Sequence, residues 1–314
     1  FSSFTYYGFE TRAWRLMEAR IRQGEFDLVH RLTPVSPAVP SPVAVRCRRA
    51  GVPFVLGPLN GGVPWPRGFE YARKGEREWM SLLRPAHRLL PGYRATRRCA
   101  SAILVGSRVT RAEIPARDAD RCVYVPENGF DPSRFGRSVD GGARLPVRVA
   151  FAGRHVRLKG VALLIRAAAP LVRDGSVVLD IIGEGPETPR LKELARSEGI
   201  VDGVEFPGWV SHEKLQDRLV RSDVFGFPSV RDFGGGVVIE AMALGLVPVV
   251  LDYGGPGEIV SPRTGFAVPM GGPPQVIEGL RSALSRLASD PTAIRPMGER
   301  AKRRVLSLFT WDAK

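Results

Sequence analysis

The chain has 314 residues, and 44% of them are hydrophobic, which is enough for two domains with ordinary apolar cores. No apolar run reaches the roughly 18 residues that a membrane-spanning helix needs, so the sequence predicts a soluble or peripheral protein. The net charge is +14, and residues 1–140 carry 23 Lys and Arg against 13 Asp and Glu, so the basic excess lies mainly in the first half.

Strands and helices alternate along the chain, which is the pattern of doubly wound parallel sheets. The predicted strands of the first half cover 28–30, 54–56, 103–105 and 123–125, and a charged helical stretch over 69–98 breaks at Pro91-Gly92. The polar, glycine-rich stretch 138–144 is the predicted linker. The predicted strands of the second half cover 147–151, 177–182, 204–206, 224–227 and 247–251. We therefore expect an α/β protein with two domains, 1–140 and 141–314.

The strand over 147–151 is followed by Gly153, by Arg154 and, five residues later, by Lys159. Open parallel sheets bind ligands at the carboxyl ends of their strands. The sequence therefore predicts two cations at a ligand-binding edge of the second sheet.

A second segment follows the strand over 224–227, where Asp232 precedes three glycines and Glu240 lies eight positions after Asp232. Gly234, Gly235 and Gly236 let backbone N–H groups approach a ligand closely, just before a mostly buried helix predicted over 237–245. Acids beside a phosphate site accept hydrogen bonds from hydroxyl groups, so the expected ligand carries both phosphate and sugar hydroxyls, as a nucleotide sugar does. A tight turn without a ligand is an equally open interpretation of this segment alone.

These segments and seven others occur in one order over most of residues 27–314, and together they resemble glycosyltransferase family 4 (glycosyl transferases group 1). The other segments are 26–30, 102–107, 125–131, 181–186, 204–210, 227–229 and 254–260. The resemblance implies the GT-B fold, with two Rossmann-like doubly wound parallel-sheet domains facing across a cleft. It also implies a retaining, nucleotide-sugar-dependent enzyme, with an acceptor-binding domain over 1–140 and a donor-binding domain over 141–314. By the same resemblance, we expect the start of the first domain and the final helices of the second to be missing.

The resemblance also implies roles for residues of the donor side. Arg154, Lys159 and the helix start at Gly234–Gly236 would stabilise the departing diphosphate in place of a metal ion, so we expect neither a metal nor another cofactor. Glu240 would hold the ribose and Asp232 the transferred sugar, where the family usually has a longer Glu. The donor-binding set is completed by Gly153 and by Trp209 and Val210, which resemble the segment that contacts the base through backbone atoms. The one Asp-x-Asp pattern, at Asp118 and Asp120, is interpreted as surface charge.

The acceptor side offers fewer candidates. His30 ends a predicted strand, and a core histidine is the alternative interpretation. Asn60, Gly61 and Gly62 belong to a turn-rich loop after another predicted strand, and a plain surface loop is equally open. These four residues are the expected acceptor-side residues.

The partners we expect are a nucleotide sugar, with UDP or GDP as the nucleotide, and a glycan or lipid-linked acceptor. The predicted activity is hexosyl transfer in cell-surface polysaccharide or glycoconjugate synthesis. Two alternatives stay open: a nucleotide-sugar epimerase of the same architecture, and a non-catalytic nucleotide-sugar-binding protein, which Asp232 in place of Glu would favour.

The basic first half has three open explanations, namely an anionic acceptor, an anionic membrane leaflet, and an arginine-rich proteome. Nucleic acid is not expected, because no binding motif accompanies the charge. The odd number of cysteines, without metal-ligand spacing, favours reduced thiols. We therefore expect a cytoplasmic protein, with the inner face of the membrane as a candidate location. A basic amphipathic surface is predicted from Arg84, Arg88, Arg94, Arg97 and Arg98 with Leu82, Leu83, Leu89 and Leu90, and a solvated charged face is the alternative.

Overall fold

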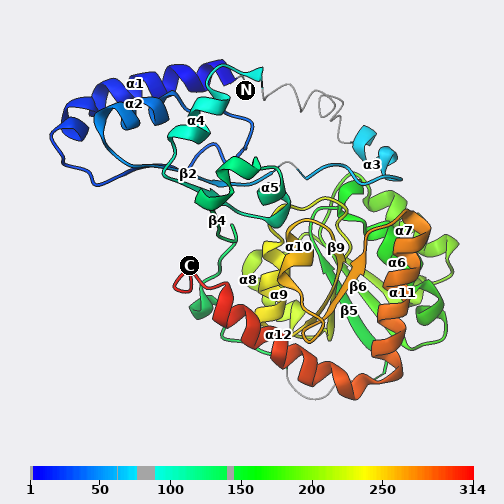
Figure 1. Ribbon diagram of the computed structural model, residues 1–314. Helices are drawn as coiled ribbons and strands as arrows, with labels where there is room; N and C mark the ends of the chain where they lie inside the picture. Colours follow the sequence, from blue (N-terminus) through cyan, green and yellow to red (C-terminus); the bar gives the residue numbers. More distant parts are fainter. Residues whose placement is uncertain (1–2, 62, 76–88, 140–144) are drawn as a thin grey trace. The chain divides into compact units, whose positions relative to one another are not determined.

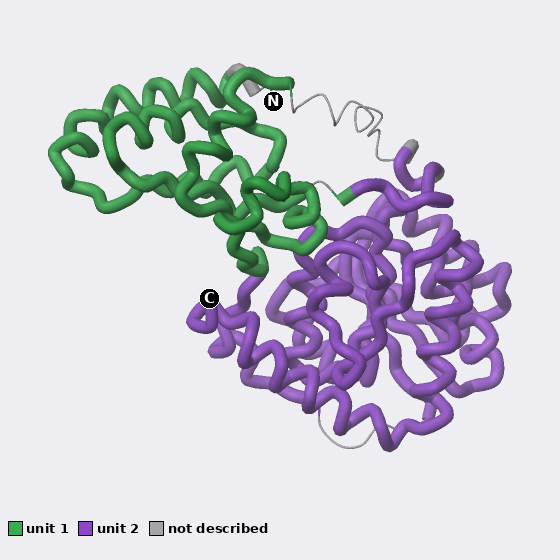
Figure 2. The backbone as a smooth tube through the Cα atoms, viewed as in Figure 1, with its two compact units in different colours: residues 1–63, 78–127 green, residues 64–77, 128–314 purple. Residues whose placement is uncertain are grey.

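The computed structural model describes residues 3–61, 63–75, 89–139 and 145–314 (Figure 1). The chain divides into two compact units, residues 1–63 with 78–127 and residues 64–77 with 128–314 (Figure 2). The units thus separate at 127/128, whereas the sequence-based division lies at 140/141. Residues after 127 pack with the second unit because the Phe130 N–H donates to the Phe309 carbonyl oxygen at 3.0 Å.

The first unit contains a four-stranded parallel sheet in the order β1-β2-β3-β4. Its strands are β1 (Val29–Arg31), β2 (Phe54–Leu59), β3 (Ala102–Val105) and β4 (Cys122–Tyr124). All four overlap the strands predicted from the sequence. Phe54, Leu56 and Ile103 lie in the core of this unit and are at most 1% exposed.

Helices of the first unit pack against one another as well as on the sheet, with α1 against α2 and α2 against α4. Helix α1 is not among the elements predicted from the sequence, although Trp14, Met17 and Ile21 recur at helical spacing and face the core. Gly92, with φ +82°, precedes α4, in agreement with the break predicted at this point. The helices are α1 (Ser3–Arg22), α2 (Pro42–Ala50), α4 (Tyr93–Cys99) and α5 (Arg108–Ala112).

The helical stretch predicted over 69–98 is present at its two ends, as α3 (Glu70–Gly75) and α4. Residues 76–88 lie outside the described residues, and so do Leu82, Leu83, Arg84 and Arg88 of the predicted basic surface. Within the part that the structure describes, no helix combines the length and the apolar character needed to cross a membrane.

The second unit contains a six-stranded sheet in the order β10-β9-β8-β5-β6-β7, and every strand pair is parallel. From β5 the chain builds one side of the sheet through β6 and β7, and it then builds the other side through β8, β9 and β10. The order reverses between β5 and β8, and doubly wound sheets bind ligands at this point. The strands are β5 (Val147–Ala152), β6 (Val177–Ile182), β7 (Val204–Gly208), β8 (Val224–Phe227), β9 (Val247–Asp252) and β10 (Phe266–Pro269).

Helices cover both faces of this sheet (Figure 1). One group packs as α6 against α7 and α11, and the other as α9 against α10 and α12. All four residues of β8 are buried, because a parallel sheet covered on both faces has no solvent side. The helices are α6 (Val161–Arg173), α7 (Thr188–Ser197), α8 (His212–Leu219), α9 (Gly236–Ala243), α10 (Gly255–Ile259), α11 (Pro273–Ser289) and α12 (Ile294–Leu308).

Candidate functional site

Two loops meet at the carboxyl ends of β5 and β8, where the strand order of the second sheet reverses. The first loop contains the 3₁₀ turn η4 (Arg157–Lys159), and the second follows β8. The Val230 N–H donates to the Leu158 carbonyl oxygen at 2.9 Å. Gly160 has φ +69°, and a Cβ atom there would lie 2.1 Å from the Pro228 carbonyl oxygen. Because this position has no side chain, the two loops can lie directly against each other.

Lys159 and Asp232 form an ion pair across these loops. The Lys159 ammonium donates to Asp232 Oδ2, and Asp232 Oδ1 accepts the Gly235 N–H at 3.1 Å. The two side chains are only 21% and 15% exposed, and the ammonium also lies 4.9 Å from the centre of the Phe227 ring. The structure therefore brings together two residues that were predicted for one site from segments 73 residues apart.

The glycine run lies where α9 begins. Gly235 has a left-handed backbone, with φ +65°, and immediately precedes the helix. A Cβ atom at Gly234 would lie 1.9 Å from Asn128 Nδ2, so this glycine admits the asparagine side chain against the loop. The N–H groups at a helix start carry partial positive charge, and Lys159 supplies a full one beside them.

Glu240 lies farther along α9 and is 28% exposed. His212 Nε2 lies 3.3 Å from Glu240 Oε1, and Arg134 Nη2 lies 3.5 Å from His212 Nδ1. If Arg134 donates to Nδ1, then Nε2 carries the hydrogen and donates to the carboxylate. Neither His212 nor Arg134 is among the residues predicted from the sequence, because both come from segments distant from α9 along the chain.

The remaining predicted donor residues lie at the ends of β5 and β7. Arg154 is exposed just after Gly153, whose N–H donates to the Ile182 carbonyl oxygen at 3.1 Å. Trp209 is 73% exposed, whereas Val210 packs against the core. A cavity of about 780 Å³ opens at the ends of β6 and β7, and Phe206 and Gly208, which immediately precedes Trp209, help to line it.

His155 follows Arg154 and is fully buried. Its Nδ1 lies 2.9 Å from Thr188 Oγ1, and burial lowers the pKa of the imidazole below its ordinary value. A neutral histidine therefore fixes the backbone directly after Arg154. The residue was not predicted from the sequence, because nothing local distinguishes a buried histidine from an exposed one.

The acceptor-side candidates all lie in the first unit. His30 is exposed, not a core histidine, and its Nε2–H donates to the Gly57 carbonyl oxygen at 2.7 Å. Asn60 is 3% exposed; its amide donates to Glu127, and its Oδ1 accepts the Gly61 N–H at 2.8 Å. Gly62 lies outside the described residues.

Asp118 corrects one expectation, because it is buried rather than part of a charged surface. It is 1% exposed and accepts a hydrogen bond from Arg121 at 2.5 Å. Asp120 is exposed, as expected. No group of three or more His, Cys, Asp or Glu side chains that could hold a metal ion occurs among the described residues.

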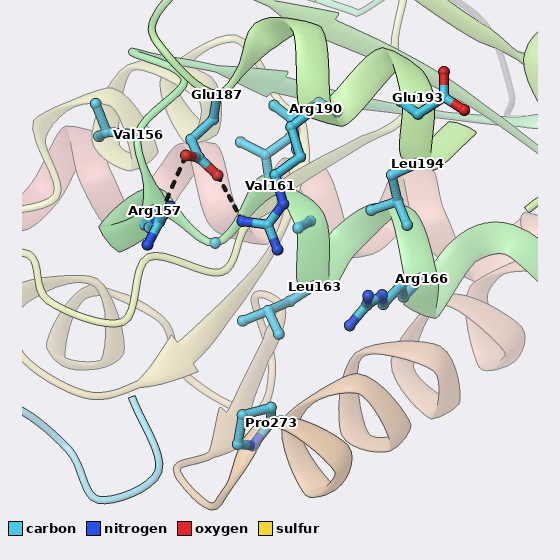
Figure 3. A pocket seen from close by; sticks show the side chains of 13 residues that line it. Val156, Arg157, Val161, Leu163, Arg166, Glu187, Arg190, Glu193, Leu194 and Pro273 are labelled. Carbon is cyan, nitrogen blue, oxygen red and sulfur yellow. Dashed lines mark hydrogen bonds and ion pairs between the residues drawn. The ribbon is translucent and has the colours of Figure 1, made fainter. Parts of the chain in front are cut away.

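A cavity of about 530 Å³ lies between α6 and α7, beside η4 (Figure 3). Arg157 and Arg190 both donate to Glu187, at 3.1 and 2.9 Å, so this ion-pair group ties η4 to the segment that precedes α7. None of the site residues predicted from the sequence lines this cavity. Gly160, which lies where the two loops of the candidate site meet, does line it, so the cavity adjoins that site.

The structure thus brings Lys159, Asp232 and the start of α9 together at the carboxyl ends of β5 and β8. Arg154 follows β5, and Glu240 lies on α9 with His212 as its partner. Cations and N–H groups stabilise a diphosphate, and carboxylates accept hydrogen bonds from sugar hydroxyls. The arrangement suits a ligand that carries both kinds of group.

Comparison with known proteins identifies the family of the chain. Residues 145–304, just over half of the chain, match the family described as Glycosyl transferases group 1. Alpha-maltose-1-phosphate synthase of Mycolicibacterium smegmatis is 32% identical over 235 residues, which cover 68% of this chain and 60% of that protein. Two other relatives are covered over 56% and 45% of their lengths, so the chain spans about half the length of the curated relatives it matches.

Solved structures share the fold of the chain. Sucrose-phosphate synthase from Thermosynechococcus elongatus matches 95% of this chain and 73% of its own, with a TM-score of 0.65 and 24% identity. Anabaena HepE, solved in complex with UDP and glucose, matches 93% of this chain and 76% of its own, with a TM-score of 0.60 and 20% identity. The fold is therefore GT-B, with two Rossmann-like parallel sheets. By its sequence match and its fold, the chain belongs to the glycosyl transferases group 1 family.

Proposed function

We propose that this chain transfers a hexose-type sugar from a nucleoside diphosphate sugar to a glycan or lipid-linked acceptor, with retention of anomeric configuration, as in glycosyltransferase family 4. The observation that carries the proposal is the Lys159–Asp232 ion pair beside the start of α9, at the point where the strand order reverses. The names of the relatives support sugar transfer, and the solved complex of HepE with UDP and glucose supports this class of donor.

The charge that develops on the departing diphosphate defines the role of the basic groups. Cleavage of the sugar–phosphate bond leaves extra negative charge on the diphosphate, and Lys159, Arg154 and the N–H groups at the start of α9 would stabilise it where it develops. These groups supply the positive charge themselves, so the proposed reaction needs no metal ion and no other cofactor.

The two acids would bind the hydroxyl groups of the donor. The ribose would take the hydrogen bond that Glu240 now accepts from His212. The diphosphate would draw Lys159 away from Asp232, which would leave a carboxylate oxygen to accept from the transferred sugar. The base would lie against the backbone of Trp209 and Val210, beside the cavity at the ends of β6 and β7.

The acceptor role is assigned to the first part of the chain, over 1–140, and the donor role to the rest. His30, Asn60 and Gly61 are the proposed acceptor-side residues that the structure describes. The net charge of +10 over residues 1–140 would favour an anionic acceptor or an anionic leaflet at the inner face of the membrane. Sedimentation with vesicles, with and without anionic lipid, would separate these two sources of negative charge.

Calorimetry of the full chain with UDP, GDP and ADP in EDTA tests the donor site. We expect one diphosphate to bind without metal and, at about 100 times its Kd, to stabilise the fold by about 2.7 kcal/mol. Arg154→Ala and Glu240→Ala should lose this effect. Arg303→Ala and Glu278→Ala, which change exposed residues on α12 and α11, are the matched controls.

Product analysis tests the reaction itself. We expect the corresponding nucleotide sugar to yield a glycoside of unchanged anomeric configuration, measured by NMR. Binding of the diphosphate without sugar transfer to any acceptor would favour the non-catalytic alternative, and conversion of the donor sugar into its epimer would favour the epimerase. If no diphosphate binds, the donor site as assigned is wrong.

A further inference from the structure

Residues 64–75, which we name the strap, lie in the sequence between two parts of the first unit but pack with the second (Figure 2). Phe69 and Ala72 are 0% exposed and belong to the hydrophobic core of the second unit. The Tyr253 hydroxyl donates to the Pro64 carbonyl oxygen at 2.7 Å. These contacts show that the strap packs as a part of the second unit.

One end of the strap contacts the loop that carries Asp232. The Arg231 guanidinium carbon lies 4.9 Å from the centre of the Trp65 ring and 5.5 Å from the centre of the Phe233 ring. Arg231 is only 9% exposed, and a cation is attracted more strongly to an aromatic face when water is excluded. Arg231 and Phe233 flank Asp232 in the chain, so these ring contacts hold the backbone on both sides of the carboxylate.

The other end of the strap contacts the loop that carries Lys159. Helix α3, which forms the second half of the strap, packs against η4, and Lys159 is the last residue of η4. The Leu158 carbonyl oxygen in turn accepts the Val230 N–H, one residue before Arg231. The strap therefore contacts both loops whose side chains form the Lys159–Asp232 ion pair.

We infer that the strap is a positioning element of the donor site, in which Trp65, through Arg231, holds Asp232 opposite Lys159. The inference rests on the proposed function for its consequence, which is that loss of Trp65 weakens binding of the donor diphosphate and sugar. The structural part of the inference is that the strap holds the loop after β8 in place, and this can be measured without any ligand. The site thus depends on a segment that lies outside both of its sequence motifs, the one that contains Lys159 and the one that contains Asp232.

Hydrogen exchange of the full chain without ligand is the first test. In Trp65→Ala, we expect the amides of Val230 and Gly235 to exchange about tenfold faster than in the unchanged protein, while amides of β6 keep their rates. Trp65→Phe keeps an aromatic face and should restore slow exchange. If Trp65→Ala does not fold, Trp65→Leu, which keeps bulk but has no ring, replaces it.

The matched control is Phe266→Ala. The centre of the Phe266 ring lies 5.2 Å from the Arg286 guanidinium carbon, so this variant removes a similar ring–cation contact from the same unit. Phe266 is the first residue of β10, whereas the candidate site lies at the carboxyl ends of β5 and β8. We expect the exchange rates of the Val230 and Gly235 amides to stay unchanged in Phe266→Ala. Equal exchange of these amides in Trp65→Ala and Phe266→Ala would overturn the inference.

Binding of the donor diphosphate is the second test. We expect Trp65→Ala to weaken the affinity for the diphosphate about tenfold or more, with recovery in Trp65→Phe and no change in Phe266→Ala. Unchanged affinity in Trp65→Ala would overturn the positioning role. If the unchanged protein binds no diphosphate, the proposed function fails, and the exchange rates alone then decide whether the strap holds the loop.

Discussion

Among the described residues, the Asp232 carboxylate has two partners, the Lys159 ammonium and the Gly235 N–H. Both carboxylate oxygens are therefore engaged, and a donor sugar would have to take one of these positions. The side chain is one methylene shorter than the Glu that is usual in the family. The exchange of Lys159 from Asp232 to the diphosphate is the central step of the proposed donor binding.

The charge of Asp232 can be tested apart from its length. Asp232→Asn keeps the size of the side chain but removes the charge, and we expect sugar transfer to fall by about 100-fold because an interaction at the reacting sugar is lost. Asp232→Glu keeps the charge and should stay within about tenfold of the unchanged enzyme. Initial rates with the nucleotide sugar measure both, and equal rates for Asp232→Asn and the unchanged enzyme would contradict the role.

His155 makes stability depend on pH in a defined direction. Burial lowers its pKa in the folded state, so the unfolded chain binds the proton first as the pH falls. Stability from this group is present above about pH 6.5, the ordinary histidine value, and is lost as the pH falls toward the folded pKa, by at most about 1.4 kcal/mol per pH unit. Urea unfolding between pH 8 and about pH 5 measures the loss.

The control for this pH dependence is His155→Gln, which removes the titrating group but keeps a polar side chain beside Thr188. We expect its stability to change less than that of the unchanged protein over the same range. Parallel curves for the two proteins would show that other groups cause the pH dependence.

At the scale of elements, the site depends on how closely the loop after β5 lies against the loop after β8. The lack of a side chain at Gly160 allows this approach, because a Cβ atom there would lie 2.1 Å from the Pro228 carbonyl oxygen. The end of η4, the strap and the start of α9 all meet these two loops. Tight packing of short connections, rather than any one helix, therefore shapes the site.

Two glycines with the same backbone separate this close approach from backbone strain. Gly160 and Gly199 have φ +69° and +68°, but only Gly160 has an atom within 4 Å of the position of a Cβ. We expect Gly199→Ala to cost about 1 kcal/mol of unfolding free energy from the left-handed backbone alone. Gly160→Ala should cost about 2 kcal/mol more, because the loops must separate. Equal losses in urea unfolding would contradict this account.

At the scale of the whole molecule, each unit has its own parallel sheet and its own hydrophobic core. The strap belongs to the second unit, although residues of the first unit precede and follow it in the chain. The candidate donor site lies entirely within the second unit. A donor ligand should therefore stabilise one unit directly.

Hydrogen exchange with and without the donor diphosphate tests this assignment. At about 100 times the Kd, we expect slower exchange in the loops after β5 and β8 and at the start of α9, by up to about 100-fold. The amides of β1 to β4 should keep their exchange rates, because a ligand that contacts only the second unit does not suppress local unfolding within the first. If the ligand slowed exchange equally in both sheets, the assignment of the donor site to the second unit alone would be wrong.

The α/β class, the two residues that form the Lys159–Asp232 ion pair and nine of the ten strands that the structure describes could all be predicted from the sequence. Short apolar segments predict strands from local sequence alone. Glycines and charged residues at the ends of those strands favour a ligand-binding edge of the sheet. The short strand β10 could not be predicted in the same way, because four residues that end in proline give little periodic signal.

The residues that support that site follow from tertiary packing instead. His212 beside Glu240, Asn128 against Gly234 and Trp65 over Arg231 join segments far apart in sequence, and no local pattern encodes such contacts. The same reason explains the separation of the units at 127/128 and the position of the strap. Composition and spacing specify elements, whereas the burial of side chains between elements decides which segments pack together.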